Sequence, residues 1–261
     1  MRKVLPFLFL FFTLSTHSQS IEEKLATLPV FDELASTKTP FDWIITPEKS
    51  KAEIYATADR KGIVVANGMV WRTLRITPNL ATTDYVNRMT GERMLRFVES
   101  EGTITIDGRR YYIGGLRGQE ERGYLLGEWI DKMTPMDSAF IVEDFSIQPI
   151  KEEFTWKRNR WALNTELPTG KDLIFTLRGQ NETAGVTLLL HFAVYDHLPV
   201  IRKWFEIENG TDHAINVDSF CLERLSMFEP DSPSGSPRDG FMLPNIHVES
   251  DYHCGGSFTQ R

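Results

Sequence analysis

The sequence predicts an all-β protein whose antiparallel strands pack as a sandwich, with few short helices. Apolar and polar residues alternate along several short runs, and Asp-Gly or Asn-Gly pairs between some of these runs favour tight turns. No stretch shows a sustained helical period of 3.6 residues, so we expect neither a helical bundle nor alternating strands and helices. Roughly ten strands follow one another at spacings of about 8–15 residues, which is typical of a sandwich.

The composition excludes several classes of protein. The chain has 261 residues, a formal net charge of −7 and 41% hydrophobic residues, which is ordinary for a folded globular protein. No basic tract is present, so we expect no nucleic-acid partner. Two cysteines are too few for a disulfide scaffold or a cysteine-rich zinc module. No Gly-rich phosphate loop fits either, and we predict no cofactor.

Residues 1–20 have the layout of a secretory signal peptide. Two positive residues precede an apolar run of 11 residues, Val4–Leu14, and small residues suited to cleavage after Ser20 follow. A membrane-spanning helix needs about 20 apolar residues, and no other segment is apolar enough to span a bilayer. We therefore expect a secreted or periplasmic protein without a membrane span.

Three further segments follow the signal peptide. Residues 21–50 form an N-terminal extension that begins with helical character over Ile21–Leu28, and residues 51–228 form the sandwich domain. Residues 229–240 are rich in Pro, Ser and Gly, which is typical of an exposed loop. The apolar stretch after this loop ends without a closing element. We interpret residues 229–261 as a loop and the truncated start of a following segment.

Two hairpins are predicted in the first half of the sandwich. Thr103–Ile106 and Arg109–Ile113 flank an Asp-Gly pair, whose two residues both tolerate the positive φ of a tight turn. Thr82–Asn87 and Arg93–Phe97 flank a five-residue stretch that contains Gly91. Both pairs of runs alternate as strands do.

Long strands are predicted in the second half. Leu173–Leu177 is one, and Val186–Tyr195 shows the clearest alternation in the chain, with five apolar residues on one face. Val200–Glu208 returns after a turn, and Asn209-Gly210 signals another turn before Ile215–Leu222. These last three strands predict a meander.

The stretch Met133–Pro168 carries weaker strand signals and three prolines. It also contains four large aromatic residues, Phe140, Phe145, Trp156 and Trp161. Because a linker between domains would not carry such residues, we interpret it as a long excursion within one domain.

The ionisable residues offer few candidates for a catalytic site. Glu206 and Glu208 share a strand face, but they lie beside the Asn-Gly turn where solvated charges are expected. His191 lies in the middle of the strongest strand. A histidine there can act as a general base, although it is more often a satisfied side chain on a half-buried sheet. Asp131, two residues after Trp129, is interpreted as a loop-capping carboxylate or a site residue.

The cysteines leave two possibilities open. Cys221 and Cys254 could form a disulfide in an oxidising compartment, and a buried free thiol at Cys221 is equally compatible with its place in an alternating strand. His247, Asp251 and His253 cluster near Cys254. Their spacing matches no closed zinc site, so we predict no metal site.

Tryptophans are numerous for a secreted β protein. Trp71 and Trp204 lie in strands and are expected in the core. Trp129 and Trp161 lie in loop-like stretches. There an indole ring either packs in the core, which is the commoner role, or is exposed and stacks against the C–H face of a sugar. We therefore name Trp129, Asp131 and Trp161 as candidate carbohydrate contacts.

A series of motifs resembles one family, and their order along the chain is the more specific part of the resemblance. The motifs are Met69–Leu74 (MVWRTL), Thr83–Glu92, Ile106–Arg110, Ile113–Gln119, Tyr195–Trp204 and Glu206–Thr211. Together they resemble the N-terminal β-sandwich of secreted bacterial α-galactosidase-like glycoside hydrolases, near glycoside hydrolase family 36. The resemblance covers most of residues 50–228.

The resemblance implies a galactose mutarotase-like super-sandwich that precedes a (β/α)₈ barrel. In that family the barrel carries the catalytic aspartates and retains the anomeric configuration. No barrel pattern follows residue 228, and a barrel takes about 250 residues, so no catalytic residue is carried over to this chain. The implied function is a non-catalytic domain that packs on a C-terminal catalytic barrel and shapes its site for a galactoside-type glycan. Trp129 with Asp131 is the expected contact loop.

Three alternatives remain open at this point. The chain could be a free-standing carbohydrate-binding module that presents exposed aromatic residues. It could be an aldose 1-epimerase-like enzyme, for which His191 is the only well-placed histidine. It could also be a structural fragment whose apolar C-terminal stretch has lost its partner.

Overall fold

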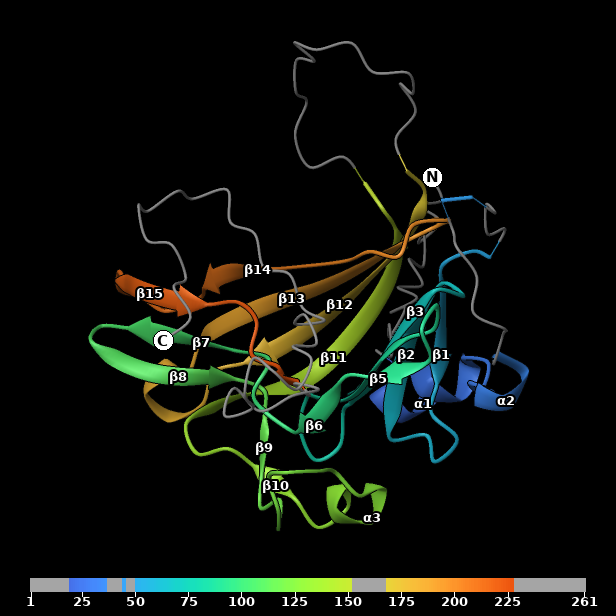
Figure 1. Cartoon of the computed structure of the whole chain (residues 1–261). Coiled ribbons are helices and arrows are strands. Elements are labelled where there is room, and N and C mark those ends of the chain that lie inside the picture. The colour runs from blue at the N-terminus through green and yellow to red at the C-terminus, as the bar shows by residue number, and fades with distance from the viewer. Residues whose placement is uncertain (1–18, 37–43, 46–49, 152–167, 228–261) are drawn as a thin grey trace, which may run out of the picture.

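A computed structural model of the chain describes residues 19–36, 44–45, 50–151 and 168–227 (Figure 1). These parts form an all-β structure of antiparallel sheets with few short helices, as the sequence predicted. The helical segments are α1 (Ile21–Thr27), α2 (Glu33–Ser36), α3 (Gly127–Ile130) and the 3₁₀ turn η1 (Asn181–Thr183). The predicted signal peptide, apart from its last two residues, and residues 228–261 lie outside the described residues.

The smaller of the two main sheets is a five-stranded antiparallel meander, in which each strand pairs with the next along the chain. Its strands are β1 (Glu53–Ala56), β2 (Gly62–Ala66), β3 (Val70–Arg75), β4 (Ala81–Asn87) and β5 (Glu92–Arg93). Every residue of β2 is buried. This explains why its sequence, GIVVA, is continuously apolar or small and does not alternate.

The larger sheet has seven strands, and both of its edges are formed by strands from the last third of the chain. In spatial order the strands are β14 (Ile201–Asn209), β13 (Val186–Tyr195), β12 (Gly170–Arg178), β11 (Ala139–Pro149), β8 (Arg109–Ile113), β7 (Gly102–Ile106) and β15 (Val217–Cys221). All neighbours are antiparallel except β11 and β8, which share a short parallel contact.

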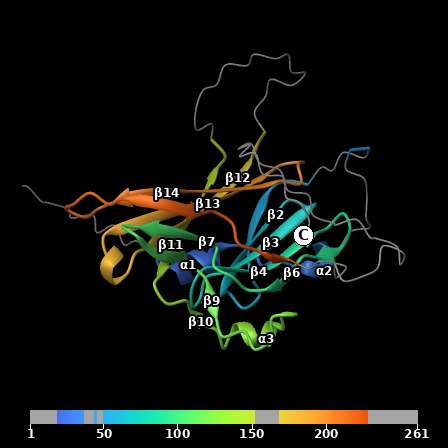
Figure 2. The ribbon, with the colours of Figure 1, turned by 60° about the vertical axis from the view of Figure 1, so that its left-hand side comes forward.

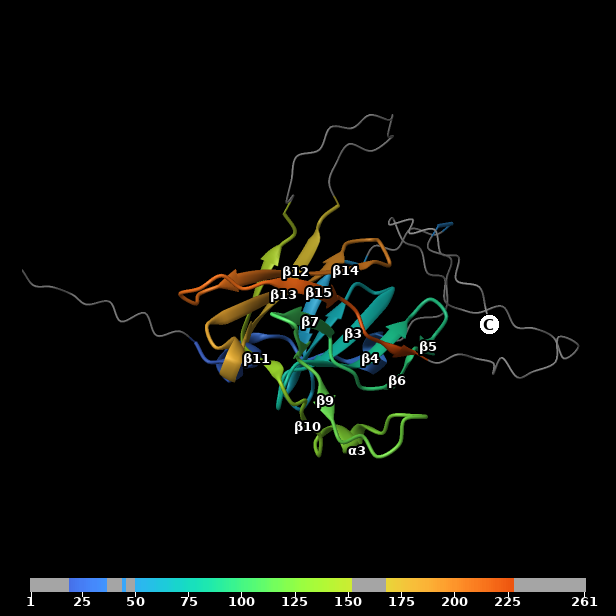
Figure 3. The same ribbon diagram turned by 90° about the vertical axis from the view of Figure 1, so that its left-hand side faces the viewer.

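Two short ribbons complete the described strands. The strand β6 (Leu95–Phe97) pairs with β16 (Ser226–Met227), and β9 (Leu116–Arg117) pairs with β10 (Thr134–Pro135). Figure 2 shows the two main sheets as two layers, with α3 projecting beyond the β9–β10 ribbon. Figure 3 shows the same projection of α3 from a second side.

The main hydrophobic core lies between the two sheets and draws on both. Every second residue of β12 and β13 points into it, as the alternation predicted. These inward residues are completely or almost completely buried: Leu173, Phe175, Leu177, Val186, Leu188, Leu190, Phe192 and Val194. Burying one such side chain contributes roughly 1.5–3 kcal/mol, so these strands supply much of the stability.

Helix α1 confirms the predicted helical start of the N-terminal extension. Ser20 caps it through a hydrogen bond from the backbone N–H of Glu23, whose carboxylate accepts from the backbone N–H of Ser20 in return. Leu25 is buried in the main core. Lys24 pairs with Asp144 of β11 at 2.6 Å, so the helix is fixed to the larger sheet.

The hairpin predictions are confirmed with one adjustment. Strands β7 and β8 pair across Asp107 and Gly108, which have φ of 49° and 78°. Strand β4 pairs with β5 as predicted, but β5 ends at Arg93. The next strand, β6, leaves this sheet and pairs with β16.

The predicted meander of three long strands is wrong for its last member. Strands β13 and β14 pair over their full length, but β15 pairs with β7 at the opposite edge of the sheet. The reason lies in the connection. Asn209 accepts from the N–H and hydroxyl of Thr211, and its amide donates to the carbonyl of His213 at 2.7 Å, which folds a longer loop. The backbone N–H of Asp107 then donates to the carbonyl of Asn216 at 2.9 Å, and the N–H of Asn216 donates to the Asp107 carboxylate at 3.0 Å, which fixes β15 beside β7.

The stretch Met133–Pro168 contains β11, the longest strand of the described chain, which the sequence pattern did not reveal. A bulge between Val142 and Asp144 shifts the register and breaks the alternation. The interpretation of an excursion within one domain agrees with Phe140 and Phe145, which are both buried in the main core. Trp156 and Trp161 lie outside the described residues.

Candidate functional site

The segment between β9 and β10, residues 118–132, contains the predicted contact residues and is named here the α3 loop. The side-chain amide of Gln119 organises it from within. Its nitrogen donates to the carbonyls of Arg96, Glu121 and Tyr124 at 2.6–3.2 Å, and its oxygen accepts from the backbone N–H of Val98 at 3.0 Å. One residue therefore satisfies four backbone groups and ties the loop to the chain around β6.

Trp129, which lies in a loop-like stretch of the sequence and was named as a candidate carbohydrate contact, is buried. Only 6% of it is exposed, and it packs in a small cluster with Val98, Leu116 and Met133. The ring of Tyr124 lies over it with centroids 5.3 Å apart. Trp129 therefore anchors the loop, because its ring is used for packing.

The exposed apolar residues of the α3 loop are Tyr124 and Leu126, which are 49% and 42% exposed. Sequence reasoning missed Tyr124. The signal was present, because a tyrosine beside Gly123 in a stretch of charged residues is rarely a core residue. The loop thus presents an aromatic ring whose support is a second, buried aromatic ring.

Asp131 fixes the C-terminal end of the α3 loop to the five-stranded sheet. Its carboxylate pairs with Lys61 at 3.0 Å and with the guanidinium of Arg75. The hydrogen bond from Lys61 and the charge of Arg75 lower the pKa of Asp131. This agrees with the loop-capping interpretation. Whether Asp131 or Trp129 touches a carbohydrate stays a prediction.

The other two predicted residue sets lie partly outside the described chain. Trp161 and Cys254 both lie outside the described residues, so the predicted Cys221–Cys254 disulfide stays a prediction. Cys221 itself is exposed, which corrects the alternative of a buried thiol. Its thiol donates to the carbonyl of Glu223 at 3.4 Å. The exposure follows from its position on the edge strand β15.

His191 lies on the outer face of the larger sheet in a polar row. Its Nδ1 is 2.9 Å from Asp172, and its ring stacks on Trp204 with centroids 4.3 Å apart. Its Nε2 lies 3.6 Å from the carboxylate of Glu206. Glu206 and Glu208 are exposed, as expected for solvated charges.

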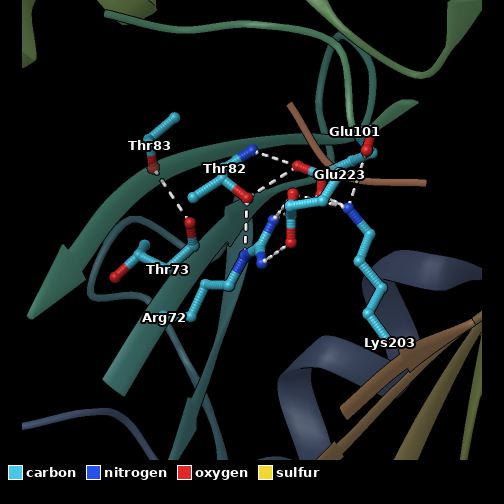
Figure 4. Close-up of polar contacts among 7 residues, drawn as sticks. All are labelled: Arg72, Thr73, Thr82, Thr83, Glu101, Lys203 and Glu223. Carbon is cyan, nitrogen blue, oxygen red and sulfur yellow. Dashed lines mark hydrogen bonds and ion pairs between the residues drawn. The ribbon is translucent and has the colours of Figure 1, made fainter. Parts of the chain in front are cut away.

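A buried ionic cluster joins the two sheets, and it consists of Arg72, Thr82, Glu101, Lys203 and Glu223 (Figure 4). Arg72 of β3 donates to both Glu101 and Glu223 at 2.7 Å. Lys203 of β14 donates to the same two carboxylates at 2.7 and 2.9 Å. The side chains of Arg72, Lys203 and Glu101 are only 2%, 6% and 1% exposed. Two positive and two negative charges therefore balance, with Glu223, which is 38% exposed, on the solvent side of the cluster.

Glu101 is the centre of the buried ionic cluster. Its second carboxylate oxygen accepts from the N–H and the hydroxyl of Thr82 at 2.6 and 2.7 Å. Burial alone would raise its pKa, but the charges of Lys203 and Arg72 outweigh this and lower the pKa to about 2. Sequence reasoning did not predict this cluster. The available signal was Lys203, which shares a strand face with apolar residues and therefore needs a buried anion.

A shallow hollow of about 240 Å³ lies at the end of the sandwich, beside the β7–β8 turn and η1. Arg109 pairs there with the carboxylate of Glu182, which also accepts from the hydroxyl of Tyr111 at 3.3 Å. Burial and the charge of Glu182 raise the pKa of Tyr111. His213 and Ile215 line the opposite side.

Among the described parts of the chain, no group of three or more His, Cys, Asp or Glu side chains is placed to hold a metal ion. The cluster of His247, Asp251, His253 and Cys254 lies beyond the described residues. In the same parts of the chain, no helix has the length and apolar character needed to cross a bilayer.

Comparison with known proteins gave no match to a family model, to a curated protein or to a solved structure.

Proposed function

We propose that this chain is the exported, non-catalytic N-terminal sandwich of an α-galactosidase-like glycoside hydrolase. In this role it packs against a catalytic barrel and shapes the rim of the sugar site. The proposal rests on the family resemblance of the motifs in residues 50–228, and on an all-β fold of the kind that the resemblance implies. The glycan itself is a galactoside-type sugar.

The α3 loop is the structural observation that supports this role. It is fixed at three points, by Gln119, by the buried Trp129 and by the ion pairs of Asp131. Yet it presents Tyr124 and Leu126 to solvent. A loop that is held rigid while it exposes apolar side chains loses little conformational freedom on binding, which favours its use as a docking element.

The chemistry of Tyr124 suits a site that is shared with a sugar. Its ring offers an apolar face for sugar C–H groups or for a barrel loop, and its hydroxyl can hydrogen-bond at the rim. Trp129 beneath it keeps the ring in place. Under this proposal Trp129 and Asp131 act by positioning Tyr124.

The test is hydrolysis of p-nitrophenyl α-galactoside by the native polypeptide, purified with an antibody against residues 50–227 from the cells that produce it. We expect activity in this material and none in the isolated 261-residue chain. Tyr124→Ala combined with Leu126→Ala in the native gene should lower the activity about tenfold or more, which corresponds to about 1.4 kcal/mol. Leu34→Ala, which removes an 87% exposed side chain from α2, is the control and should have no effect. Purified native material that lacks activity would contradict the proposal.

A free-standing carbohydrate-binding module is the second candidate, and the hollow beside Tyr111 favours it. Arg109, Glu182 and Tyr111 converge there as donors and acceptors for sugar hydroxyls. Titration calorimetry of the 261-residue chain with galactosides separates the two functions. Binding that is lost in Glu182→Gln but kept in Tyr124→Ala would favour the module, and the absence of heat with every glycan would exclude it.

A further inference from the structure

We infer that His191 is the cationic centre of a proton-dependent latch, in which Asp172 of β12 and Glu206 of β14 hold the imidazole ring from either side. The latch lies on the outer face of the larger sheet and joins the edge strand β14 to β12 across β13. It involves no residue of the α3 loop, so the inference does not depend on the proposed function.

The strand register places one carboxylate at each nitrogen of the His191 ring. Asp172 pairs with Ala193, and Glu206 pairs with Leu189, so the two acids lie on diagonally opposite sides of His191. Diagonal neighbours across a sheet are within reach of long side chains. The Nδ1 atom of His191 is 2.9 Å from Asp172, and its Nε2 atom is 3.6 Å from Glu206.

Neither neutral form of the imidazole ring fits this arrangement. A neutral ring carries one proton, so one nitrogen donates and the other presents a lone pair. With the proton on Nδ1, the lone pair of Nε2 faces the carboxylate of Glu206. With the proton on Nε2, the lone pair of Nδ1 faces the carboxylate of Asp172. Only the imidazolium, in which both nitrogens donate, has a favourable contact on each side.

Asp172 forms the fixed side of the latch, and it needs a positive neighbour. Its side chain is 5% exposed, and its Oδ1 atom has no hydrogen-bond partner among the described residues. Its Oδ2 atom accepts from the amide of Gln148 at 3.1 Å, which holds the carboxylate in place. A buried carboxylate is unfavourable unless it is paired, and within the described chain His191 is the cationic partner that it has.

Glu206 forms the movable side of the latch. The His191 side chain is only 6% exposed, and its Nε2 atom has no hydrogen-bond partner among the described residues. The side chain of Glu206 is 60% exposed, so its carboxylate is free to approach a protonated Nε2 or to turn into water when the proton is absent. The contact between His191 and Glu206 is therefore the part that responds to the proton.

The other groups around the ring act in both directions. Trp204 of β14 stacks on His191 with the ring centroids 4.3 Å apart, and the face of an indole ring attracts a cation. The guanidinium of Arg202 lies 4.4 Å from the centroid of the same indole, and its charge opposes a second cation. From β11 the facing side chain is the uncharged Gln148, whose oxygen accepts from Lys151 at 3.0 Å. The two carboxylates lie at the ring nitrogens themselves, so attraction prevails.

The latch holds the edge strand more firmly in acid than in alkali. An imidazole ring gains or loses its proton within roughly pH 5–8. On the acidic side of this range His191 donates to both acids and connects all three strands. As the pH rises through the range, the contact with Glu206 is lost and β14 opens more often.

The experiment is hydrogen exchange of the β14 amides at about pH 5.5 and about pH 8, corrected for the intrinsic exchange rate at each pH. In the wild type we expect about threefold more frequent opening at the higher pH, the size of effect that an ion pair with one exposed partner gives. Nitrogen NMR of the His191 ring should show a proton on both nitrogens at the lower pH.

Two matched variants identify the acid responsible. Glu206→Gln presents an amide that can donate to a neutral ring, so opening of β14 should no longer depend on pH. Glu208→Gln removes the same charge from the same face of β14, but this residue pairs with Thr187, so the threefold difference should remain. The amides of β2, in the smaller sheet, are the reference for a change of the whole fold.

Four results would overturn the inference. The first is a neutral His191 ring at about pH 5.5 in the folded wild type. The second is equal opening of β14 at the two pH values in the wild type. The third is the same pH response in Glu206→Gln as in the wild type. The fourth is a pH response that β2 shares equally, because this would show a change of the whole fold and no local latch.

Discussion

Strands β13 and β15 belong to the same sheet but differ in burial and in the number of strands they pair with. The inward residues of β13 are completely or almost completely buried, and the strand has a partner on each side. Strand β15 has one described partner, and its inward aromatic residue, Phe220, is largely exposed. The difference shows that burial in this sheet is concentrated around β12 and β13, and that the β15 edge adds less to the closed core.

The buried ionic cluster lies at the boundary between these two regions. Lys203 reaches it from β14, and Glu223 reaches it from the segment just after β15. The two edges are thus joined by charge at one point and by Phe205 and Phe220 at another.

The largest expected effect comes from the buried ionic cluster. Glu101→Gln should lower the free energy of unfolding by about 3–5 kcal/mol, because it leaves Arg72 and Lys203 with one carboxylate between them. The matched control is Glu143→Gln, whose pair with Arg178 is exposed by about half on both sides and should contribute below about 1 kcal/mol. Denaturant unfolding measures both. Equal losses of unfolding free energy in the two variants would show that the buried ionic cluster stabilises the fold no more than a surface ion pair does.

The second prediction compares one phenylalanine from each region. Phe192→Ala should lower the free energy of unfolding by about 3–5 kcal/mol, because it opens a cavity in a closed core. Phe220→Ala should lower it by less than about 2 kcal/mol, because much of this ring already meets solvent. Denaturant unfolding of both variants measures the two losses of unfolding free energy. A larger loss of unfolding free energy for Phe220→Ala than for Phe192→Ala would contradict this comparison, because it would show that the contact of Phe220 with Phe205 stabilises the fold more than its exposure indicates.

The third prediction concerns pH. The pKa of Glu101 is about 2 in the folded chain against an ordinary value near 4.5, so its charge stabilises the folded state above pH 4.5. This contribution, on the order of 3 kcal/mol, should be lost as the pH falls from 4.5 to 2. The difference in unfolding free energy between the wild type and Glu101→Gln should therefore shrink over this window. A difference that stays constant down to pH 2 would contradict the assignment.

The smallest effect is expected in the α3 loop. Asp131→Asn removes the ion pairs to Lys61 and Arg75. Because Asp131 is 56% exposed and Arg75 keeps its pair with Asp59, the melting temperature should change little. Amides of residues 129–132 should nevertheless exchange faster, because the loop loses one of its three anchors. Hydrogen exchange measures this change, and Asp137→Asn, which breaks the exposed pair with Arg117, is the control. A large fall in melting temperature would show that the loop is part of the core.

The fold class and most strands could be predicted from the sequence, because alternation and turn residues act locally. Strand β13 shows this most clearly, since its predicted bounds are its observed bounds. The partner of β15 could not be predicted, because pairing across a sheet depends on contacts far apart in the chain, such as Asn216 with Asp107. Strand β11 could not be predicted either, because a bulge between Val142 and Asp144 breaks the alternation of its residues.

The candidate site was predicted only in part. The position of the contact loop followed from Trp129 and Asp131, but sequence composition could not show that Trp129 faces inward and Tyr124 outward. Indole rings suit both roles, so only packing distinguishes them. The buried ionic cluster draws its residues from five separate segments, and no local pattern unites them.

The central claim is that the α3 loop docks on a catalytic barrel, and photo-cross-linking tests it most directly. A benzophenone amino acid would replace Tyr124 in the producing cells, and Leu34 in a control strain. The account predicts a cross-link from position 124 to peptides outside residues 1–261 that carry α-galactosidase activity, and none from position 34. Absence of a cross-link at position 124 in material that contains the intact polypeptide would contradict it.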